Sequence, residues 1–290
     1  MSSASDWTLY ARNSSLERVA EIDDYARCSL VPRFNATGAW QLEIRADSSA
    51  ADHLVFGAGI EAIHVGGHRA ISGPVIGLER RWSVSEDRIV VDGATDEIWL
   101  SARVAYPEAP ALTTATSAYD VRTGVASTVM RAYVENNAGP SADSARRVTG
   151  LTVDPDPNFG SSVTGRGRFQ PLSDILVELA IAGGDLGFRV AQSGEALLFQ
   201  VYSPQDMTDT AIFSEDIGNL SAFIYSAKAP TTNFVVVGGG GEGTARTFVS
   251  GGDSASITKY GRFESFDDRR DTTDPTELGQ ERDKDLLEGA

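Results

Sequence analysis

Residues 26–46 alternate apolar and polar side chains on both sides of a short turn, and no other stretch constrains the fold as strongly. The turn reads Asn35-Ala-Thr-Gly38. Strict alternation beside an Asn/Gly turn predicts a β-hairpin with one face on a core and the other in water. The apolar positions of its two arms are Cys28, Leu30, Phe34, Trp40, Leu42 and Ile44.

The rest of the first hundred residues continues in the same way. Gly66-Gly67 is a two-residue turn, Gly73-Pro74 bends the chain, and residues 51–56 favour a short helix. At least six short strands at tight spacing predict an antiparallel β-barrel or sandwich rather than a βαβ domain. Beside the hairpin, the expected strands cover residues 16–22, 60–65, 68–72, 75–84, 88–91 and 98–104.

The pattern changes after Pro107-Glu-Ala-Pro110. Helical spacing predicts a helix over residues 117–136, and a second helix opens at Pro171 and ends at Gly183-Gly184. Its apolar stripe is Leu172, Ile175, Leu176 and Leu179.

Strands are expected again after the second helix. Residues 188–190 and 196–201 read as a hairpin, and residues 220–226, 233–237 and 244–249 as single strands. Asp274-Pro-Thr-Glu277 then offers an Asp cap, a proline at the first helical position and a glutamate that reaches back, so a final helix is expected to begin there.

These elements define the fold class as α+β, with mainly antiparallel β-barrel or sandwich domains and an inserted α/β segment. The expected domains are an N-terminal β-barrel domain over 1–110, an inserted α/β domain over 111–206, and a second β segment over 207–290 that ends in a helix. The final helix has few apolar positions, so we expect the natural chain to continue past Ala290.

Charge and cysteine content exclude several kinds of protein. The chain carries 41 Asp and Glu against 25 Lys and Arg, a net charge of −16, which repels nucleic acid phosphates. Such a surface suits either plain solubility or a channel whose walls must not hold DNA. Cys28 is the single cysteine, so no intrachain disulfide forms, and folding in a reducing cytoplasm is expected. The sequence shows neither a secretory signal nor a membrane-spanning segment.

Two loops resemble ligand-binding motifs without meeting their requirements. Residues 238–243 form a glycine run, but a strand is expected after it and no lysine follows, so a flexible hairpin tip is the better interpretation than a phosphate loop. Asp154, Asp156 and Asn158 alternate as in a calcium loop, yet Phe159 and Gly165 stand where that loop needs glycine and glutamate. A polar surface loop is therefore expected there.

The remaining candidates for chemistry are isolated. His64 and His68 flank the Gly66-Gly67 turn without a third ligand nearby, and His53 stands apart. Cys28 lies on the apolar face of its strand, which favours a buried thiol over a nucleophile. Trp40 and Trp99 fall on the apolar phase of their strands, leaving Trp7 and Trp82 for any sugar platform. We therefore assign no catalytic residue, no cofactor-binding residue and no metal ligand.

Short motifs along nearly the whole chain resemble a minor tail protein family of siphophages of actinobacteria, the ReqiPepy type. No single motif is diagnostic, and the resemblance lies in their order and spacing. The motifs are Trp7-Thr-Leu-Tyr10, Arg18-Val-Ala-Glu-Ile22, Arg33-Phe-Asn35, Gly38-Ala-Trp40, Gly57-Ala-Gly-Ile60, Ile71-Ser-Gly-Pro74, Ile98-Trp-Leu100, Arg103, Tyr133-Val-Glu-Asn-Asn137, Arg168-Phe169, Phe199-Gln-Val-Tyr202, Gly261-Arg-Phe-Glu264 and Arg269-Arg-Asp271.

The resemblance implies a structural tail-tip or baseplate hub protein without enzymatic activity. Such hubs form homotrimers whose β-barrels make a ring coaxial with the tail tube, and two similar barrels in each subunit match the sixfold symmetry of the tube. Implied partners are the distal tail protein ring, the tape measure protein and other tail-tip proteins, with DNA passing through transiently. The implied location is the virion tail tip, after synthesis in the host cytoplasm.

Two other functions stay open at this point. A cell-envelope (peptidoglycan) hydrolase would need a pocket with perturbed carboxylates. A carbohydrate-binding module would need a row of exposed aromatic side chains.

Overall fold

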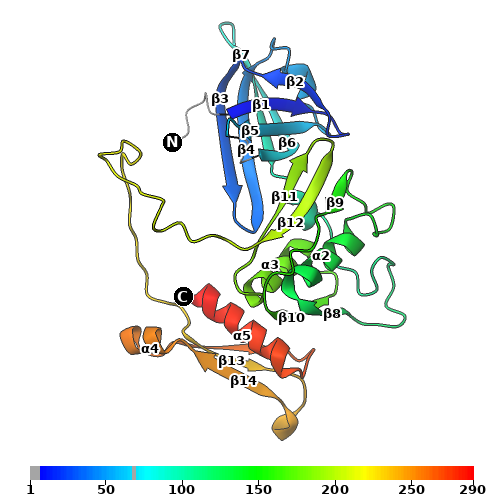
Figure 1. Cartoon of the computed structure of the whole chain (residues 1–290), viewed down its shortest axis with the longest axis vertical. Coiled ribbons are helices and arrows are strands. Elements are labelled where there is room, and N and C mark those ends of the chain that lie inside the picture. Colours follow the sequence, from blue (N-terminus) through cyan, green and yellow to red (C-terminus); the bar gives the residue numbers. More distant parts are fainter. Residues whose placement is uncertain (1–6, 67–69) are drawn as a thin grey trace. The chain divides into compact units, whose positions relative to one another are not determined.

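The computed structural model describes residues 7–66 and 70–290 (Figure 1). Contacts divide the chain into two compact units, the first ending at Pro204 and the second covering Gln205–Ala290. The mixed α+β class with mainly antiparallel sheets is confirmed. The division at residues 110 and 206 into three domains stays a prediction.

The first unit begins with a seven-stranded antiparallel sheet in the order β2-β1-β5-β6-β7-β4-β3 (Figure 1). Among the described residues β2 and β3 are the terminal strands and do not pair with each other, so the predicted barrel is not closed. The strands are β1 (Trp7–Arg12), β2 (Arg18–Ile22), β3 (Tyr25–Arg33), β4 (Ala36–Arg45), β5 (Gly59–His64), β6 (Ala70–Trp82) and β7 (Asp87–Ala94).

The predicted first hairpin is confirmed as β3 and β4. Cys28 lies opposite Leu42, and Leu30 lies opposite Trp40. The turn is tighter than expected, because β4 already starts at Ala36 after Phe34 and Asn35. The alternation predicts Phe34 on the apolar face, but Phe34 is 58% exposed because it lies in this turn and not in a strand.

Strand β6 curls the sheet around its core. Its first part pairs with β5 and its second part with β7, with a register shift between Val75 and Gly77. Gly73 lies at the bend, where a Cβ atom would come within 1.7 Å of the Ala94 carbonyl oxygen. The enclosed core contains Leu9, Ala11, Ile22, Trp40, Leu42, Ile44, Ala50, Leu54, Ile60, Ala62, Val75 and Val91. The helix expected over 51–56 is a single 3-10 turn, Ala51–His53.

The strand expected over residues 98–104 is wrong, because α1 (Ile98–Ser101) is a one-turn helix. The Trp99 amide donates to the Asp96 carbonyl, and Leu100 is fully buried against α3 (Leu172–Ala182). Tertiary packing on α3 overrides the local alternation of apolar residues.

The helix expected over residues 117–136 is only half right. Its first part is strand β8 (Asp120–Val125), which pairs with β10 (Ser162–Gly167), and only α2 (Ala126–Asn137) is helical. β8 carries the β-branched residues Val121, Thr123 and Val125, which favour a strand when a partner is present. The helix begins where the Asp156 carboxylate accepts hydrogen bonds from the hydroxyls of Ser127 and Thr128.

The second predicted helix and the following hairpin are confirmed. α3 ends one residue before Gly183, and its predicted stripe of four apolar residues is buried. β11 (Gly187–Ser193) pairs with β12 (Ala196–Tyr202), and β9 (Leu151–Val153) runs parallel to β12. With α2 these elements enclose the second core of the unit, which centres on Tyr133 and Phe199.

Residues 203–233 contain no helix and no strand. The strand expected over 220–226 is therefore wrong. Strand pairing needs a neighbour for each backbone group, and this stretch has none in the chain that the structure describes.

The second unit holds a three-stranded sheet and two helices. β13 (Phe234–Gly238) is central, antiparallel to β14 (Phe248–Gly252) and parallel to β15 (Glu264–Asp268). The glycine run connects β13 to β14, which is the position predicted for it at a hairpin tip. β14 starts later than expected, because residues 243–245 form a 3-10 turn. The helices are α4 (Ser254–Tyr260) and α5 (Pro275–Gly289).

The predicted start of the final helix is confirmed. The Asp274 carboxylate accepts a 2.8 Å hydrogen bond from the Thr276 amide, and Pro275 is the first helical residue. Leu278 is buried with Val235 and Val237. No helix within the described ranges is long and apolar enough to cross a membrane.

Candidate functional site

The histidines do not form a metal site in the part of the chain that the structure describes. His64 packs edge-on against Trp7, with ring centroids 5.2 Å apart, and His53 is exposed on the surface. Gly67 and His68, the other half of the predicted histidine pair and its turn, lie outside the described residues. No group of three His, Cys, Asp or Glu residues in these ranges could hold a metal ion.

The calcium-like loop has a different role. Asp154 accepts a 2.8 Å hydrogen bond from Gln200, and Asp156 binds the hydroxyls at the start of α2. Burial raises the pKa of Asp156, but hydrogen bonds from Thr128, Asn158 and Ser127 outweigh this and hold the pKa below its usual value. The two carboxylates stabilise the loop and the helix start.

The glycine run is explained by close packing. A Cβ atom on Gly239 would lie 2.9 Å from the Leu278 side chain, and one on Gly240 would lie 3.0 Å from the Arg270 carbonyl oxygen. These glycines let α5 and the residues before it approach the end of β13. A single 3-10 turn and then strand β14 follow the run, and no α-helix begins there, so its backbone amides are not arranged as in a phosphate loop.

The side chains considered as a nucleophile or a sugar platform are mostly enclosed. Cys28 is half-buried, and burial raises the pKa of its thiol to about 11, so the unreactive protonated form dominates at neutral pH. Trp40 is 2% exposed and donates to the Ala94 carbonyl, while Trp99 packs against the second core. Among the described tryptophans only Trp82 is largely exposed, so there is no row of them for sugar stacking.

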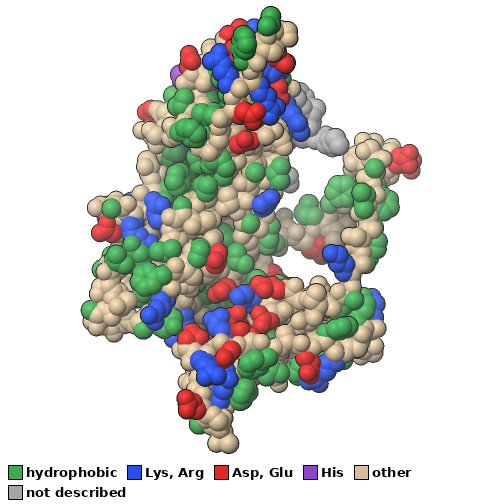
Figure 2. Space-filling model, turned by 180° about the vertical axis from the view of Figure 1, so that it is seen from behind, with side chains coloured by type: hydrophobic (Ala, Val, Ile, Leu, Met, Phe, Trp, Pro, Cys, Tyr) green, Lys and Arg blue, Asp and Glu red, His purple; other side chains and the backbone are tan. Residues whose placement is uncertain are grey.

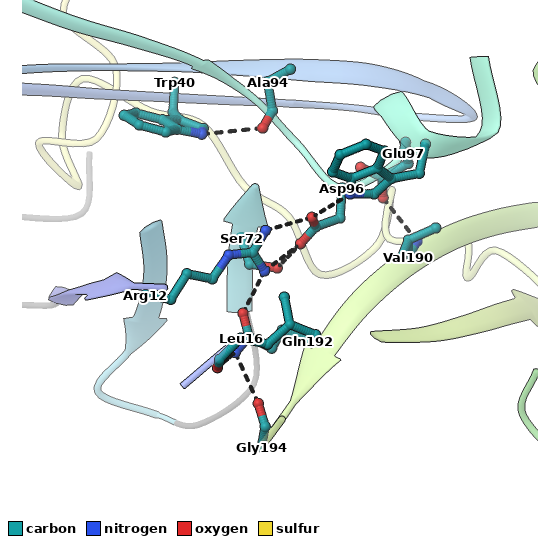
Figure 3. Close-up of polar contacts among 11 residues, drawn as sticks. Arg12, Leu16, Trp40, Ser72, Ala94, Asp96, Glu97, Val190, Gln192 and Gly194 are labelled. Carbon is teal, nitrogen blue, oxygen red and sulfur yellow. Dashed lines mark hydrogen bonds and ion pairs between the residues drawn. The ribbon is translucent and has the colours of Figure 1, made fainter. Parts of the chain in front are cut away.

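The most developed polar cluster in the first unit is a buried set of four side chains from three strands and one turn, shown in Figure 3. We call Arg12, Ser72, Asp96 and Gln192 the polar junction. Arg12 forms a bidentate pair with Asp96, with nitrogen–oxygen distances of 2.6 and 2.9 Å. The Ser72 hydroxyl donates to the same carboxylate at 2.6 Å. The Arg12 side chain is 3% exposed and that of Asp96 is 0% exposed.

Gln192 connects the junction to the helical layer, by which we mean α2 and α3 with strands β9, β11 and β12. Its Oε1 accepts from Arg12 at 2.5 Å, and its Nε2 donates to the carbonyls of Leu16 and Gly194, both at 2.8 Å. Gln192 belongs to β11, whereas Arg12 ends β1 and Ser72 lies in β6. A buried charge left without its partner is costly, so the junction fixes the sheet and the helical layer in one relative position.

Two further contacts reinforce this connection. Glu97 accepts a 3.0 Å hydrogen bond from the Val190 amide (Figure 3). Asn35, in the first hairpin turn, donates to the Leu186 carbonyl and accepts from the Phe188 amide, both at 2.8 Å. Burial raises the pKa of Glu97 despite its hydrogen bonds.

Sequence reasoning missed all four members of the polar junction. They come from distant positions, they match no motif, and each is an ordinary residue in its local context. The only local signal is Arg12, a charged residue that directly follows the apolar alternation of β1, and that signal is weak.

Exposed charges behave differently from the junction. Around the β6–β7 turn of the first unit, basic and acidic side chains are intermixed (top of Figure 2). They form local pairs such as Arg80–Asp87 at 2.5 Å and Arg45–Asp47 at 2.7 Å. Such exposed pairs contribute little to stability and leave no charge free for chemistry.

The sequence matches one family model over nearly its whole length. A family model described as Siphovirus ReqiPepy6 Gp37-like protein matches residues 7–290. No curated protein matches the sequence.

Solved structures share the fold across almost the whole chain. Prophage tail protein gp18 from Listeria monocytogenes is 9% identical with a TM-score of 0.53, over 96% of this chain and 76% of the other. A tail protein from Neisseria meningitidis is 10% identical with a TM-score of 0.50, over 97% and 76%. At these identities the likeness shows the fold alone.

Proposed function

Because this chain belongs to the siphovirus ReqiPepy6 Gp37-like family, we propose that it is a baseplate hub at the phage tail tip. In this role it forms a ring coaxial with the tail tube and links the tube to distal host-recognition proteins. The likeness of its fold to two tail proteins over nearly its full length supports the proposal.

The observation that carries an assembly role is an exposed apolar segment. We define the apolar segment as residues 205–227, which lack helix and strand (Figure 1). Phe213 is 72% exposed, Phe223 77% and Ile224 98%. Figure 2 shows hydrophobic side chains along it. A soluble protein rarely leaves so many bulky apolar side chains in water unless another surface covers them.

We propose that neighbouring copies in a homotrimer cover this segment. Strands at the sheet ends, among them β2, β3, β14 and β15, also have unpaired edges among the described residues, and such edges invite pairing with other chains. Further proposed partners are the distal tail protein ring and the tape measure protein. The net charge of −16 fits walls past which DNA slides without binding.

The hub is proposed to act without enzymatic activity. Three buried carboxylates of the first unit are engaged in structural contacts: Asp96 pairs with Arg12, Glu61 pairs with Arg18 at 2.6 Å, and Glu97 accepts from a backbone amide. A catalytic acid or base must instead be free to exchange a proton with a substrate.

The molar mass of the purified chain tests this proposal. Light scattering coupled to size exclusion is expected to give three times the 30.9 kDa chain mass. Changing Phe223 and Ile224 together to serine is expected to yield monomers. The matched control changes Phe56 and Val84, which are 66% and 97% exposed outside the segment, and is expected to stay trimeric.

Two other results would contradict parts of this proposal. A wild-type chain that stays monomeric at high concentration contradicts the trimeric hub. A trimer that survives the Phe223 and Ile224 changes contradicts the role of the apolar segment but not the trimeric hub.

A further inference from the structure

Three arginines stand close together without an acidic partner. Arg103, Arg146 and Arg147 have no carboxylate oxygen within 4.0 Å in the part of the chain that the structure describes. Most arginines of the first unit's sheet pair with Asp or Glu. In a chain with a net charge of −16, an unneutralised arginine group is unusual.

Backbone carbonyls hold these three side chains in place. Arg103 donates from Nε to the Arg146 carbonyl at 2.7 Å, and Arg147 donates from Nε to the Ala142 carbonyl at 2.9 Å. Arg146 stacks on the Tyr106 ring, with its guanidinium carbon 3.4 Å from the ring centroid. Neutral carbonyls orient the guanidinium groups but do not cancel their charge.

The positive charges affect each other. Burial lowers the pKa of Arg146 and the charge of Arg103 lowers it further, whereas Tyr106 and Asp143 act in the opposite direction without cancelling the shift. The terminal nitrogens of Arg147 have no hydrogen-bond acceptor among the described residues, and they remain available as a fork for an incoming carboxylate.

Arg103 and Arg147 line a cleft of about 270 Å³ in the first unit. Its other walls are mainly apolar and include Leu16, Trp99 and Leu197. This volume lies just below the range of about 300–1,000 Å³ that holds drug-sized ligands, so the cleft suits one or two side chains of a peptide.

We propose that this cleft binds an acidic peptide segment of a partner protein. A carboxylate of the peptide pairs with Arg103 and Arg147, and an adjacent aliphatic side chain packs on the apolar wall. A nucleic acid is a poorer match, because the apolar wall offers nothing to a phosphate and the charge of the whole chain repels a polyanion. The inference does not depend on the trimeric hub, since one copy supplies the entire cleft.

Titration of the full chain with the peptide acetyl-Asp-Leu-Leu-Glu-amide tests the proposal by calorimetry. We expect saturable binding that weakens about tenfold or more in Arg147→Gln, because charge-assisted hydrogen bonds are lost. Arg103→Gln is expected to weaken binding in the same direction. Arg81→Gln removes the same charge from an exposed pair with Glu79 on β6, and it is expected to bind as the wild type does.

Two further ligands separate peptide recognition from general anion binding. The neutral peptide acetyl-Asn-Leu-Leu-Gln-amide is expected not to bind, and inorganic phosphate is expected not to displace the acidic peptide. Absence of acidic-peptide binding overturns the proposal. Equal binding of the neutral peptide, displacement by phosphate, or equal weakening by Arg81→Gln also overturns it.

Discussion

At the scale of single residues, Asp96 holds the first unit together. Its carboxylate accepts two hydrogen bonds from Arg12, one from Ser72 and a longer one of 3.3 Å from Trp99. Every one of these donors is at least half-buried, so none can turn to water if the carboxylate is removed. The junction therefore stabilises the fold mainly because removal of one partner leaves another charge buried and unpaired.

We expect Asp96→Asn to lower the free energy of unfolding by about 3–5 kcal/mol, because it leaves the Arg12 charge buried and unpaired. Urea unfolding followed by circular dichroism measures this change. Arg45→Gln, which breaks an exposed pair with Asp47, serves as the control and is expected to leave the unfolding midpoint unchanged. Equal effects of the two changes would show that burial of the junction does not add to the free energy of unfolding.

The raised pKa of Glu97 predicts that the free energy of unfolding depends on pH. Burial raises its folded pKa above the usual 4.5, so the folded state holds the proton more tightly than the unfolded state. The stability gained from this proton is full below about pH 4.5 and is lost as the pH rises through the folded pKa. The neutral amide of Glu97→Gln still accepts from Val190 and removes this titration.

We therefore expect Glu97→Gln to gain stability relative to the wild type between about pH 4 and about pH 8. Urea midpoints of both proteins across this range measure the difference. A difference that stays constant with pH, or that grows as the pH falls, would contradict the raised pKa.

At the scale of elements, the sequence predicts what is decided locally. The β3–β4 hairpin, α3 and the start of α5 each carry their own signals: alternation, an apolar stripe and an Asp-Pro cap. The predictions for the residues of α1 and β8 are wrong, because the conformation of these residues depends on α3 and β10, which lie far away in the sequence. The polar junction could not be predicted for the same reason.

The cap of α5 gives a prediction at this scale. Asp274→Ala removes the acceptor for the Thr276 amide and is expected to lower helix stability by about 0.5–2 kcal/mol. Hydrogen exchange of the α5 amides measures the effect, which should be a faster exchange confined to the second unit. Asp274→Asn keeps a capping oxygen and is expected to exchange nearly as slowly as the wild type. Equal rates in all three proteins would mean that the cap does not limit the opening of α5.

At the scale of the whole molecule, three surface features are not explained by contacts within the described chain. The apolar segment, the open strand edges and the arginine-lined cleft each contain groups that the described chain does not satisfy by itself. The two cores of the first unit, in contrast, are built of buried apolar side chains that contact one another. This contrast is typical of a protein that completes its structure by association.

An image of the virion tail tip by cryo-electron microscopy tests the central claim most directly. The account predicts three copies of this fold in a ring around the tail axis, with the apolar segment of each copy covered by a neighbouring chain. Density for this fold as separate single copies away from the axis, with the apolar segment in solvent, would contradict it.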